Sequence, residues 1–100
     1  KNRAMKEKAF NDYVEKVTDL FKISQEDLFA KSKRRDIVDA RHLLYYLCFN
    51  RPMQIRYIQE YMERSGYKLG HSTIIHGIDQ VKDKVNDDVD YKEITQTILA

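Results

Sequence analysis

The sequence predicts an all-α fold, a compact domain of five or six helices that contains a helix-turn-helix. Apolar residues recur at three- and four-residue spacing and rarely alternate, which favours helices over strands. The chain has only 3 Gly and 1 Pro, which is little material for tight hairpins. With 100 residues and 42% hydrophobic content, residues 1–100 are expected to form a single domain.

The first helix is expected from about Met5 to Phe21, because its apolar residues follow a helical period. They are Phe10, Tyr13, Val14, Val17, Leu20 and Phe21. A short helix over residues 25–30 should follow. Ser24 and Asp27 have the spacing of a capping box at its start, with Asp in place of the usual Glu.

Residues 31–36 contain four basic side chains and no apolar one, so they are predicted to form a solvent-exposed loop. The basic residues are Lys31, Lys33, Arg34 and Arg35. Such a loop either solubilises the surface or offers charge to phosphates. The next helix is expected over residues 37–50 and is the most apolar segment. Arg41 and His42 lie on its first turns, near this basic loop.

The helix-turn-helix is predicted over about residues 53–85. Pro52 disfavours helix at the residue before it and can open a helix over residues 53–64. After the turn, a second helix is expected over residues 71–85, with Ser or Thr capping its start. Its predicted buried residues are Ile74, Ile75, Ile78, Val81 and Val85. This pattern fits an ordinary capped amphipathic helix, and it also fits a recognition helix whose first residues reach base edges.

A short last helix is expected over residues 91–99. Asp90 and Glu93 have the spacing of a second capping box at its start.

The charge is unevenly distributed, although the net charge is only +2. Residues 1–70 carry 15 Lys and Arg against 10 Asp and Glu, whereas residues 71–100 carry 3 against 6. A basic front and an acidic tail suit a domain that meets a polyanion with one surface, although solvated helix faces produce similar asymmetries.

Most catalytic and metal-binding classes find no support in the sequence. There is no Gly-rich phosphate-binding loop, and the single Cys48 excludes an internal disulfide and suggests a small buried hydrophobe. His71 and His76 are five residues apart, which is not the spacing of two ligands on one helix face. No nucleophile, base and acid are grouped in one stretch. We therefore expect no enzyme, cofactor, metal site or small-molecule substrate, and, without a long apolar run, a cytoplasmic rather than a membrane protein.

Two stretches carry a resemblance to a known family. Residues 17–35, which include Val17-Thr18-Asp19-Leu20-Phe21-Lys22-Ile23 and the basic loop, resemble the opening of the C-terminal DNA-binding domain of the bacterial replication initiator DnaA. Gly70-His71-Ser72-Thr73-Ile74-Ile75-His76 resembles that family's signature, Asp-His-Thr-Thr-Val-Leu-His, at the start of its recognition helix. The resemblance covers roughly residues 14–85 and implies a helix-turn-helix fold of the Trp-repressor-like kind.

The resemblance also implies a set of DNA-binding residues. The readers of the major groove fall on His71, Ser72 and Thr73, and His76 matches a residue for helix packing or a phosphate. Arg41 and His42 match an Arg-Gln pair that holds phosphates. Further contacts are expected from the basic loop and its surroundings, at Lys31, Lys33, Arg34, Arg35, Arg51 and Lys68.

Some positions depart from the family pattern. Its minor-groove arginine falls on Asp39, and a phosphate-contacting lysine falls on Phe49, with Arg51 as a nearby substitute. These departures and the acidic tail favour an alternative function, a helical protein-interaction module in a larger assembly, such as a phage particle or a replisome adaptor. The main expectation is a stand-alone duplex-DNA-binding protein, phage- or plasmid-encoded or accessory, for replication initiation or transcription control. It would lack an ATPase module, act in a bacterial or phage-infected cell, and meet other replication or phage proteins.

Overall fold

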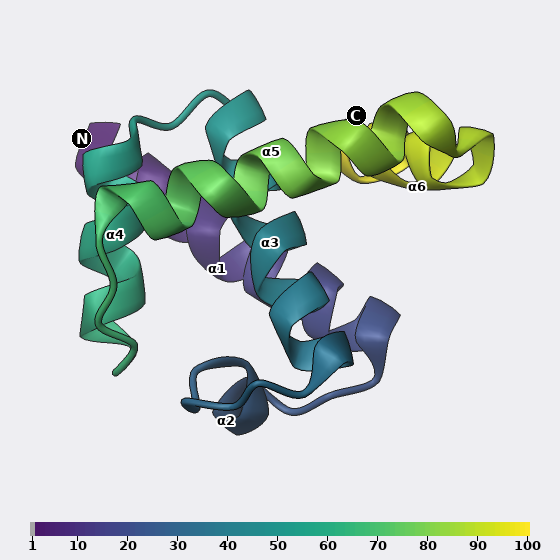
Figure 1. Ribbon diagram of the computed structural model, residues 1–100. Coiled ribbons are helices and arrows are strands. Elements are labelled where there is room, and N and C mark those ends of the chain that lie inside the picture. Colours follow the sequence, from purple (N-terminus) through teal and green to yellow (C-terminus); the bar gives the residue numbers. More distant parts are fainter. Residues whose placement is uncertain (1) are drawn as a thin grey trace.

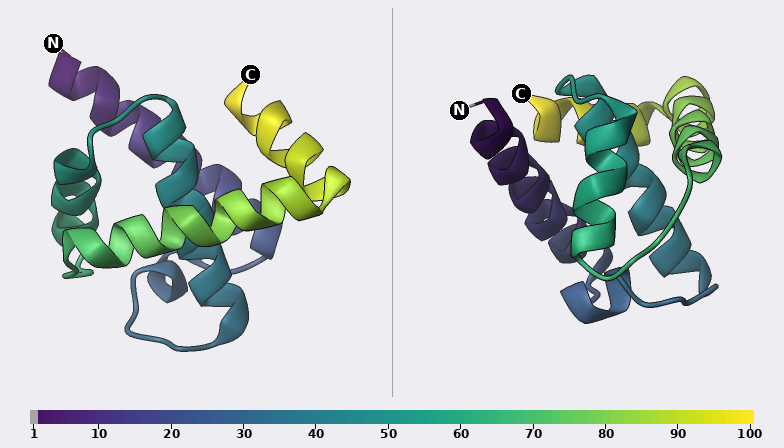
Figure 2. Two further views of the ribbon diagram at one scale, coloured as in Figure 1. Left: turned by 45° about the horizontal axis from the view of Figure 1, so that its top comes forward. Right: turned by 90° about the vertical axis from the view of Figure 1, so that its left-hand side faces the viewer.

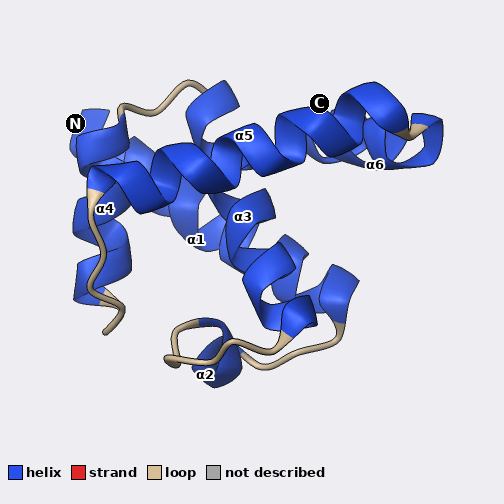
Figure 3. Cartoon of the chain, in the orientation of Figure 1, coloured by secondary structure: helices blue, strands red, loops and turns tan. Residues whose placement is uncertain are grey.

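The computed structural model describes residues 2–100, which form six α-helices and, within that range, no strand (Figures 1 and 3). The all-α prediction is therefore confirmed. The helices are α1 (Asn2–Phe21), α2 (Gln25–Leu28), α3 (Arg35–Asn50), α4 (Ile55–Arg64), α5 (His71–Asp87) and α6 (Val89–Leu99). Among the described residues, no helix combines the length and apolarity that a bilayer crossing requires.

Helix α3 lies at the centre of the molecule and makes its most extensive contacts with α5 and α1 (Figure 1). Figure 2 shows α5 lying across α3, while α6 turns back from the end of α5. The fully buried side chains of α3 include Leu43, Leu44, Leu47 and Cys48. Burial raises the pKa of the Cys48 thiol, as expected for a small core residue without polar partners.

Four helices begin at other residues than the sequence predicts, and one of them is α6, which begins at Val89 instead of residue 91. Helix α3 begins at Arg35 instead of residue 37, because the Asp36 carboxylate accepts a hydrogen bond from the Ile37 N–H at 2.9 Å. A carboxylate in the first turn also suits the positive end of the helix dipole. Helix α4 begins at Ile55, two residues late, since Met53 is buried in the core from the preceding connection. The N-terminal helix begins at Asn2, three residues before the predicted start.

The predicted helix caps are partly right. The Ser24 hydroxyl accepts a hydrogen bond from the Asp27 N–H at 3.0 Å, as the capping box predicts. For α6 the cap is Asp88 and not Asp90, because the Asp88 carboxylate accepts from two N–H groups of the first turn, at 2.9 and 3.2 Å. For α5 the cap is Gly70, which offers no side chain, so Ser72 lies inside the first turn and does not cap the helix.

Two of the predicted core residues are exposed. Ile75 is 45% exposed and Leu20 is 43% exposed, whereas Ile74, Ile78 and Val81 are buried as predicted. The reason in α5 is Gly77, which occupies the buried side of the helix. Ile75 lies two residues earlier and therefore about 200° away around the helix axis. It points away from the core.

Gly77 marks the closest approach of α5 to α3. A Cβ atom added at this position would lie 2.8 Å from Cδ2 of both His42 and Tyr45. Only a residue without a side chain allows the two helices to cross at this separation. The position of α5 and of its exposed side chains therefore depends on this crossing.

We expect Gly77→Ala to lower the free energy of unfolding by about 1–3 kcal/mol, because the added methyl group overpacks the crossing. Gly70→Ala is the matched control, since a Cβ atom there meets no heavy atom within 4 Å. Denaturant unfolding of both variants measures the difference. A Gly77→Ala protein as stable as the control would contradict the close packing of α5 on α3.

Candidate nucleic-acid interface

The basic loop between α2 and α3 is held in place by Arg41. This side chain is only 4% exposed. Its Nε donates to the carbonyl of Leu28 at 2.8 Å, and its Nη2 donates to the carbonyls of Ala30 and Ser32 at 2.6 and 3.0 Å. A buried guanidinium requires such partners, because an unpaired buried charge is strongly unfavourable. Arg41 therefore fixes the backbone path from the end of α2 into the loop.

This position differs from the sequence prediction, which gives Arg41 a direct contact with phosphates. The helix periodicity places residue 41 one turn before Tyr45, and both side chains are buried. Its hydrogen bonds go to the protein's own carbonyls, which have the same acceptor chemistry as a phosphate oxygen. The structure thus gives Arg41 a positioning role.

The loop is also fastened to the turn that precedes α5. The Arg41 guanidinium lies 4.5 Å from the centre of the Tyr67 ring, and the Lys31 ammonium lies 4.3 Å from the centre of the same ring. Lys31 Nζ also donates to the carbonyl of Lys68 at 2.8 Å. Two segments more than 30 residues apart in the sequence therefore lie side by side, immediately before the start of α5.

The turn between α4 and α5 has a defined shape. Gly66 adopts a φ of +99°, a left-handed conformation that glycine tolerates best. Its N–H donates to the carbonyl of Glu63 at 3.0 Å, and the Tyr67 N–H donates to the carbonyl of Met62 at 3.0 Å, which together end α4. Gln59 Nε2 then donates to the carbonyl of Leu69 at 2.9 Å. The start of α5 is thereby held against α4.

We call His71, Ser72 and Thr73 the recognition tip, because they form the exposed first turn of α5. No side chain caps this end, so its backbone N–H groups and polar side chains can bind an external acceptor. The positive end of the helix dipole lies here as well and favours an anion. Short hydroxyl and imidazole groups at this position suit base edges or phosphate oxygens.

We call the exposed cations of the loop between α2 and α3, together with Lys68 in the turn before α5, the basic rim. Its members are Lys31, Lys33, Arg34, Arg35 and Lys68. Arg34 makes two hydrogen bonds to the Asp36 carboxylate, at 2.8 and 3.1 Å, and the bond to Arg34 lowers the pKa of Asp36 below its usual value. Arg35 has an 89% exposed side chain, and its contact with Asp39 is long, at 3.7 Å.

Asp39, which falls on the family's minor-groove arginine, is not an isolated negative charge. Its carboxylate lies 3.3 Å from Lys84 Nζ on α5 as well as 3.7 Å from Arg35 Nε. Partly exposed ion pairs of this kind contribute about 0–1 kcal/mol to stability. Their larger effect is to offset the charge of an acid that faces the same side as basic residues.

His42 and His76 lie together where α3 and α5 cross, with ring centres 5.7 Å apart. Burial lowers the pKa of His42, and His76 lowers it further. Asp39 acts in the opposite direction, whereas Lys84 and Arg41 also lower this pKa. The position of His42 therefore disfavours the charged form of its imidazole. His76 remains exposed on the side of α5 that faces His42.

Arg51 lies at the opposite end of α3 from the basic loop. It follows the far end of α3, which is about 24 Å long at 1.5 Å per residue, and it lines a hollow with Met5, Lys6 and Pro52. One further cation near this end of α3 is not among the residues that the sequence predicts. Lys82 of α5 is exposed, and its ammonium lies 5.8 Å from the centre of the Phe49 ring, close to where the resemblance expects a cation. Only the packing of α5 on α3 reveals this proximity.

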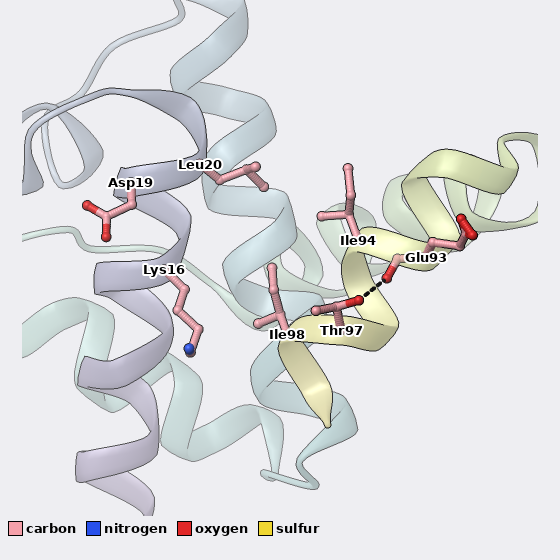
Figure 4. A pocket seen from close by; sticks show the side chains of 7 residues that line it. All are labelled: Lys16, Asp19, Leu20, Glu93, Ile94, Thr97 and Ile98. Atoms are coloured by element: carbon pink, nitrogen blue, oxygen red, sulfur yellow. Dashed lines mark hydrogen bonds between the residues drawn. The ribbon is translucent and has the colours of Figure 1, made fainter.

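A separate hollow of about 530 Å³ lies between α1 and α6 (Figure 4). Figure 4 shows Leu20, Ile94 and Ile98 around it, and Lys16, Asp19, Glu93 and Thr97 complete its lining. It contains no grouping of nucleophile and base. Among the described residues, no cluster of three or more His, Cys, Asp or Glu side chains is arranged to hold a metal ion.

Comparison with known proteins supports the resemblance seen in the sequence. The family described as "Bacterial dnaA protein helix-turn-helix" matches residues 11–81. This range begins within α1 and ends within α5, so it includes the basic loop, the turn and the recognition tip. No solved structure matches the chain significantly.

Two curated relatives are chromosomal replication initiator proteins DnaA. The protein of Leptospira biflexa is 26% identical over 76 residues, which is 76% of this chain and 16% of the relative. The protein of Gloeobacter violaceus is 31% identical over 88 residues, which is 85% of this chain and 19% of the relative. The chain therefore spans less than a fifth of the length of these relatives.

We expect Arg41→Ala to lower the free energy of unfolding by about 2–4 kcal/mol, because three loop carbonyls lose a charged donor. Arg41→Lys should recover only part of this loss, since one ammonium cannot span three carbonyls. Arg35→Ala, at an exposed cation, is the control and should stay within about 0.5 kcal/mol of wild type. Denaturant unfolding and amide exchange in the loop measure both effects. Wild-type stability and loop protection in Arg41→Lys would argue against the positioning role.

The lowered pKa of His42 predicts a pH dependence of stability. Since the folded state disfavours the charged form, this contribution is present above the unfolded pKa of about 6.5 and is lost as the pH falls below it. The melting temperature of wild type should therefore fall more steeply between about pH 7.5 and pH 5 than that of His42→Gln. His71→Gln, at an exposed position, should keep the wild-type slope. Equal slopes for wild type and His42→Gln would exclude this role of His42.

Proposed function

Because this chain belongs to the bacterial DnaA helix-turn-helix family, we propose that it binds duplex DNA through helix α5. The observation that carries the proposal is the attachment of the basic rim to the turn before the recognition tip, through Lys31, Tyr67 and Arg41. Cations beside the start of a recognition helix suit a DNA backbone, while the tip enters the major groove. The function is binding and not catalysis.

In this arrangement the two groups of residues have different tasks. The cations of the basic rim contact phosphates and set the register of the protein on the duplex. His71, Ser72 and Thr73 contact base edges, where a hydroxyl or imidazole group can donate or accept a hydrogen bond. The names of the relatives place them in chromosomal replication initiation. We accordingly propose a role in replication initiation or transcription control in the bacterial cytoplasm, in a bacterium or in a phage-infected cell.

A protein-interaction module is the second candidate function. One observation favours it, the hollow between α1 and α6, where Leu20 and Ile94 are 43% and 42% exposed. Asp19 and Glu93 also line this hollow, so its partner would be an amphipathic helix with basic flanks. The ion pairs of Asp39 weaken the case for this alternative. Because Arg35 and Lys84 offset the negative charge of Asp39, that residue repels a DNA backbone less than an unpaired carboxylate would.

We expect the full chain to bind duplex DNA with a strong dependence on salt. If the five cations of the basic rim neutralise about five phosphates, log K should fall by about 4–5 per decade of salt. The titration uses a random-sequence duplex and a duplex with a DnaA-type box, each at low and moderate salt. Preference for the box would support base readout by the tip. No binding to either duplex at low salt would reject the proposed function in favour of the protein-interaction module.

The same titration separates the two groups of residues. Arg35→Ala should weaken binding to both duplexes alike and reduce the salt slope by about one. Ser72→Ala should instead cost about 1–3 kcal/mol on the preferred duplex alone, if its hydroxyl contacts a base edge. An equal loss from Ser72→Ala on both duplexes would exclude a readout role for this residue.

A further inference from the structure

Ile75 lies on an exposed flank of α5, next to the stripe of side chains that faces the core. Gly77 faces α3 and lies against His42 and Tyr45, and Ile75 is about 200° from it around the helix. Ser72 precedes Ile75 by three residues, so both side chains lie on one exposed face, one turn apart. Figure 1 shows α5 lying in front of α3, and the Ile75 side chain is 45% exposed.

Among the described residues, Ile75 is not one of those that form the core or pack against it. Among the described residues, the other large apolar side chains that are exposed lie on helices other than α5. The neighbours of Ile75 on the outer face are His71, Ser72 and Asp79, which are exposed and polar. A docking surface for a protein requires several apolar side chains together. A single apolar side chain among hydrogen-bonding groups instead resembles the mixed lining that reads a DNA groove.

We infer that Ile75 determines specificity by contacting the methyl group of a thymine in the major groove. This inference rests on the proposed duplex-binding function. Ile75 is the fifth residue of α5, so it lies about 6 Å along the helix axis from His71, at 1.5 Å per residue. It therefore enters the groove together with the recognition tip. The base that it contacts is adjacent to those that the tip reads.

The chemistry of the groove singles out thymine. Its C5-methyl is the apolar group that a base pair presents on the major-groove edge, whereas the other edges present donors and acceptors. The isoleucine side chain has neither a hydrogen-bond donor nor an acceptor. When it displaces water from a polar base edge, the donors and acceptors of that edge are left without a partner. Against a thymine methyl, both surfaces are apolar and both gain from leaving water. Ile75 thus favours thymine and disfavours cytosine at one position of the site.

The test compares thymine with deoxyuridine, which differs only in lacking the methyl group. A preferred site is first selected from a random duplex library with the wild-type chain, and each thymine is then replaced singly by deoxyuridine. At one position, the replacement should weaken wild-type binding about three- to fivefold, the value of one buried methyl group. Ile75→Ala should lose a similar amount on the thymine duplex and lose nothing further on the deoxyuridine duplex.

Leu20→Ala and Ile94→Ala are matched controls, because their side chains are as exposed as Ile75 and lie on α1 and α6. Both should retain the full sensitivity to deoxyuridine, and all three variants should unfold at wild-type denaturant concentrations. A selected site without thymine, no selected site, or an undiminished deoxyuridine effect in Ile75→Ala would overturn the inference while duplex binding itself persists. Absence of any duplex binding at low salt would instead remove the proposed function and this inference together.

Discussion

The buried guanidinium of Arg41 is the interaction on which the candidate interface depends. The loop that it holds is polar and basic, so it cannot be fixed by burying apolar surface. One cation instead satisfies carbonyls from Leu28, Ala30 and Ser32 and stacks on Tyr67. Because a buried charge requires all of these partners, any movement of the loop away from the turn is opposed by a large electrostatic cost. The rim and the recognition tip therefore keep a fixed relation.

Both halves of the interface are mounted on the same helix. The first half of α3 carries Arg41, which holds the basic loop, and its middle carries His42 and Tyr45, which receive α5 at Gly77. Arg41 and Tyr45 are four residues apart, so the spacing between the two attachments is about one helical turn. A regular helix is stiff over this length. The relative position of the basic loop and α5 is thus fixed by α3 and not by the loops themselves.

Helical periodicity predicted the order and type of the elements, because it depends only on neighbours along the chain. The prediction from periodicity failed where burial or contact of a residue depends on side chains that are distant in the sequence. Ile75 follows the apolar pattern of α5, yet Gly77 occupies the buried side and turns Ile75 outward. The family resemblance places Arg41 at a phosphate, whereas the folded loop supplies it with carbonyl partners that the sequence does not reveal. The proximity of Lys31 to Lys68 could not be seen in the sequence, since it joins segments 37 residues apart.

The acidic residues next to the basic rim have a consequence for discrimination between sites. Asp36 and Asp39 act as internal counterions for Arg34, Arg35 and Lys84. A phosphate that approaches these cations competes with a carboxylate that is already in place, so the attraction to an arbitrary duplex is smaller than the number of cations implies. Among the described residues, no carboxylate forms an ion pair with the recognition tip. For a duplex-binding protein, pairing of the rim cations with carboxylates weakens binding to arbitrary DNA sequences more than binding to the preferred site. The affinity for nonspecific DNA and the affinity for the preferred site therefore depend on different residues.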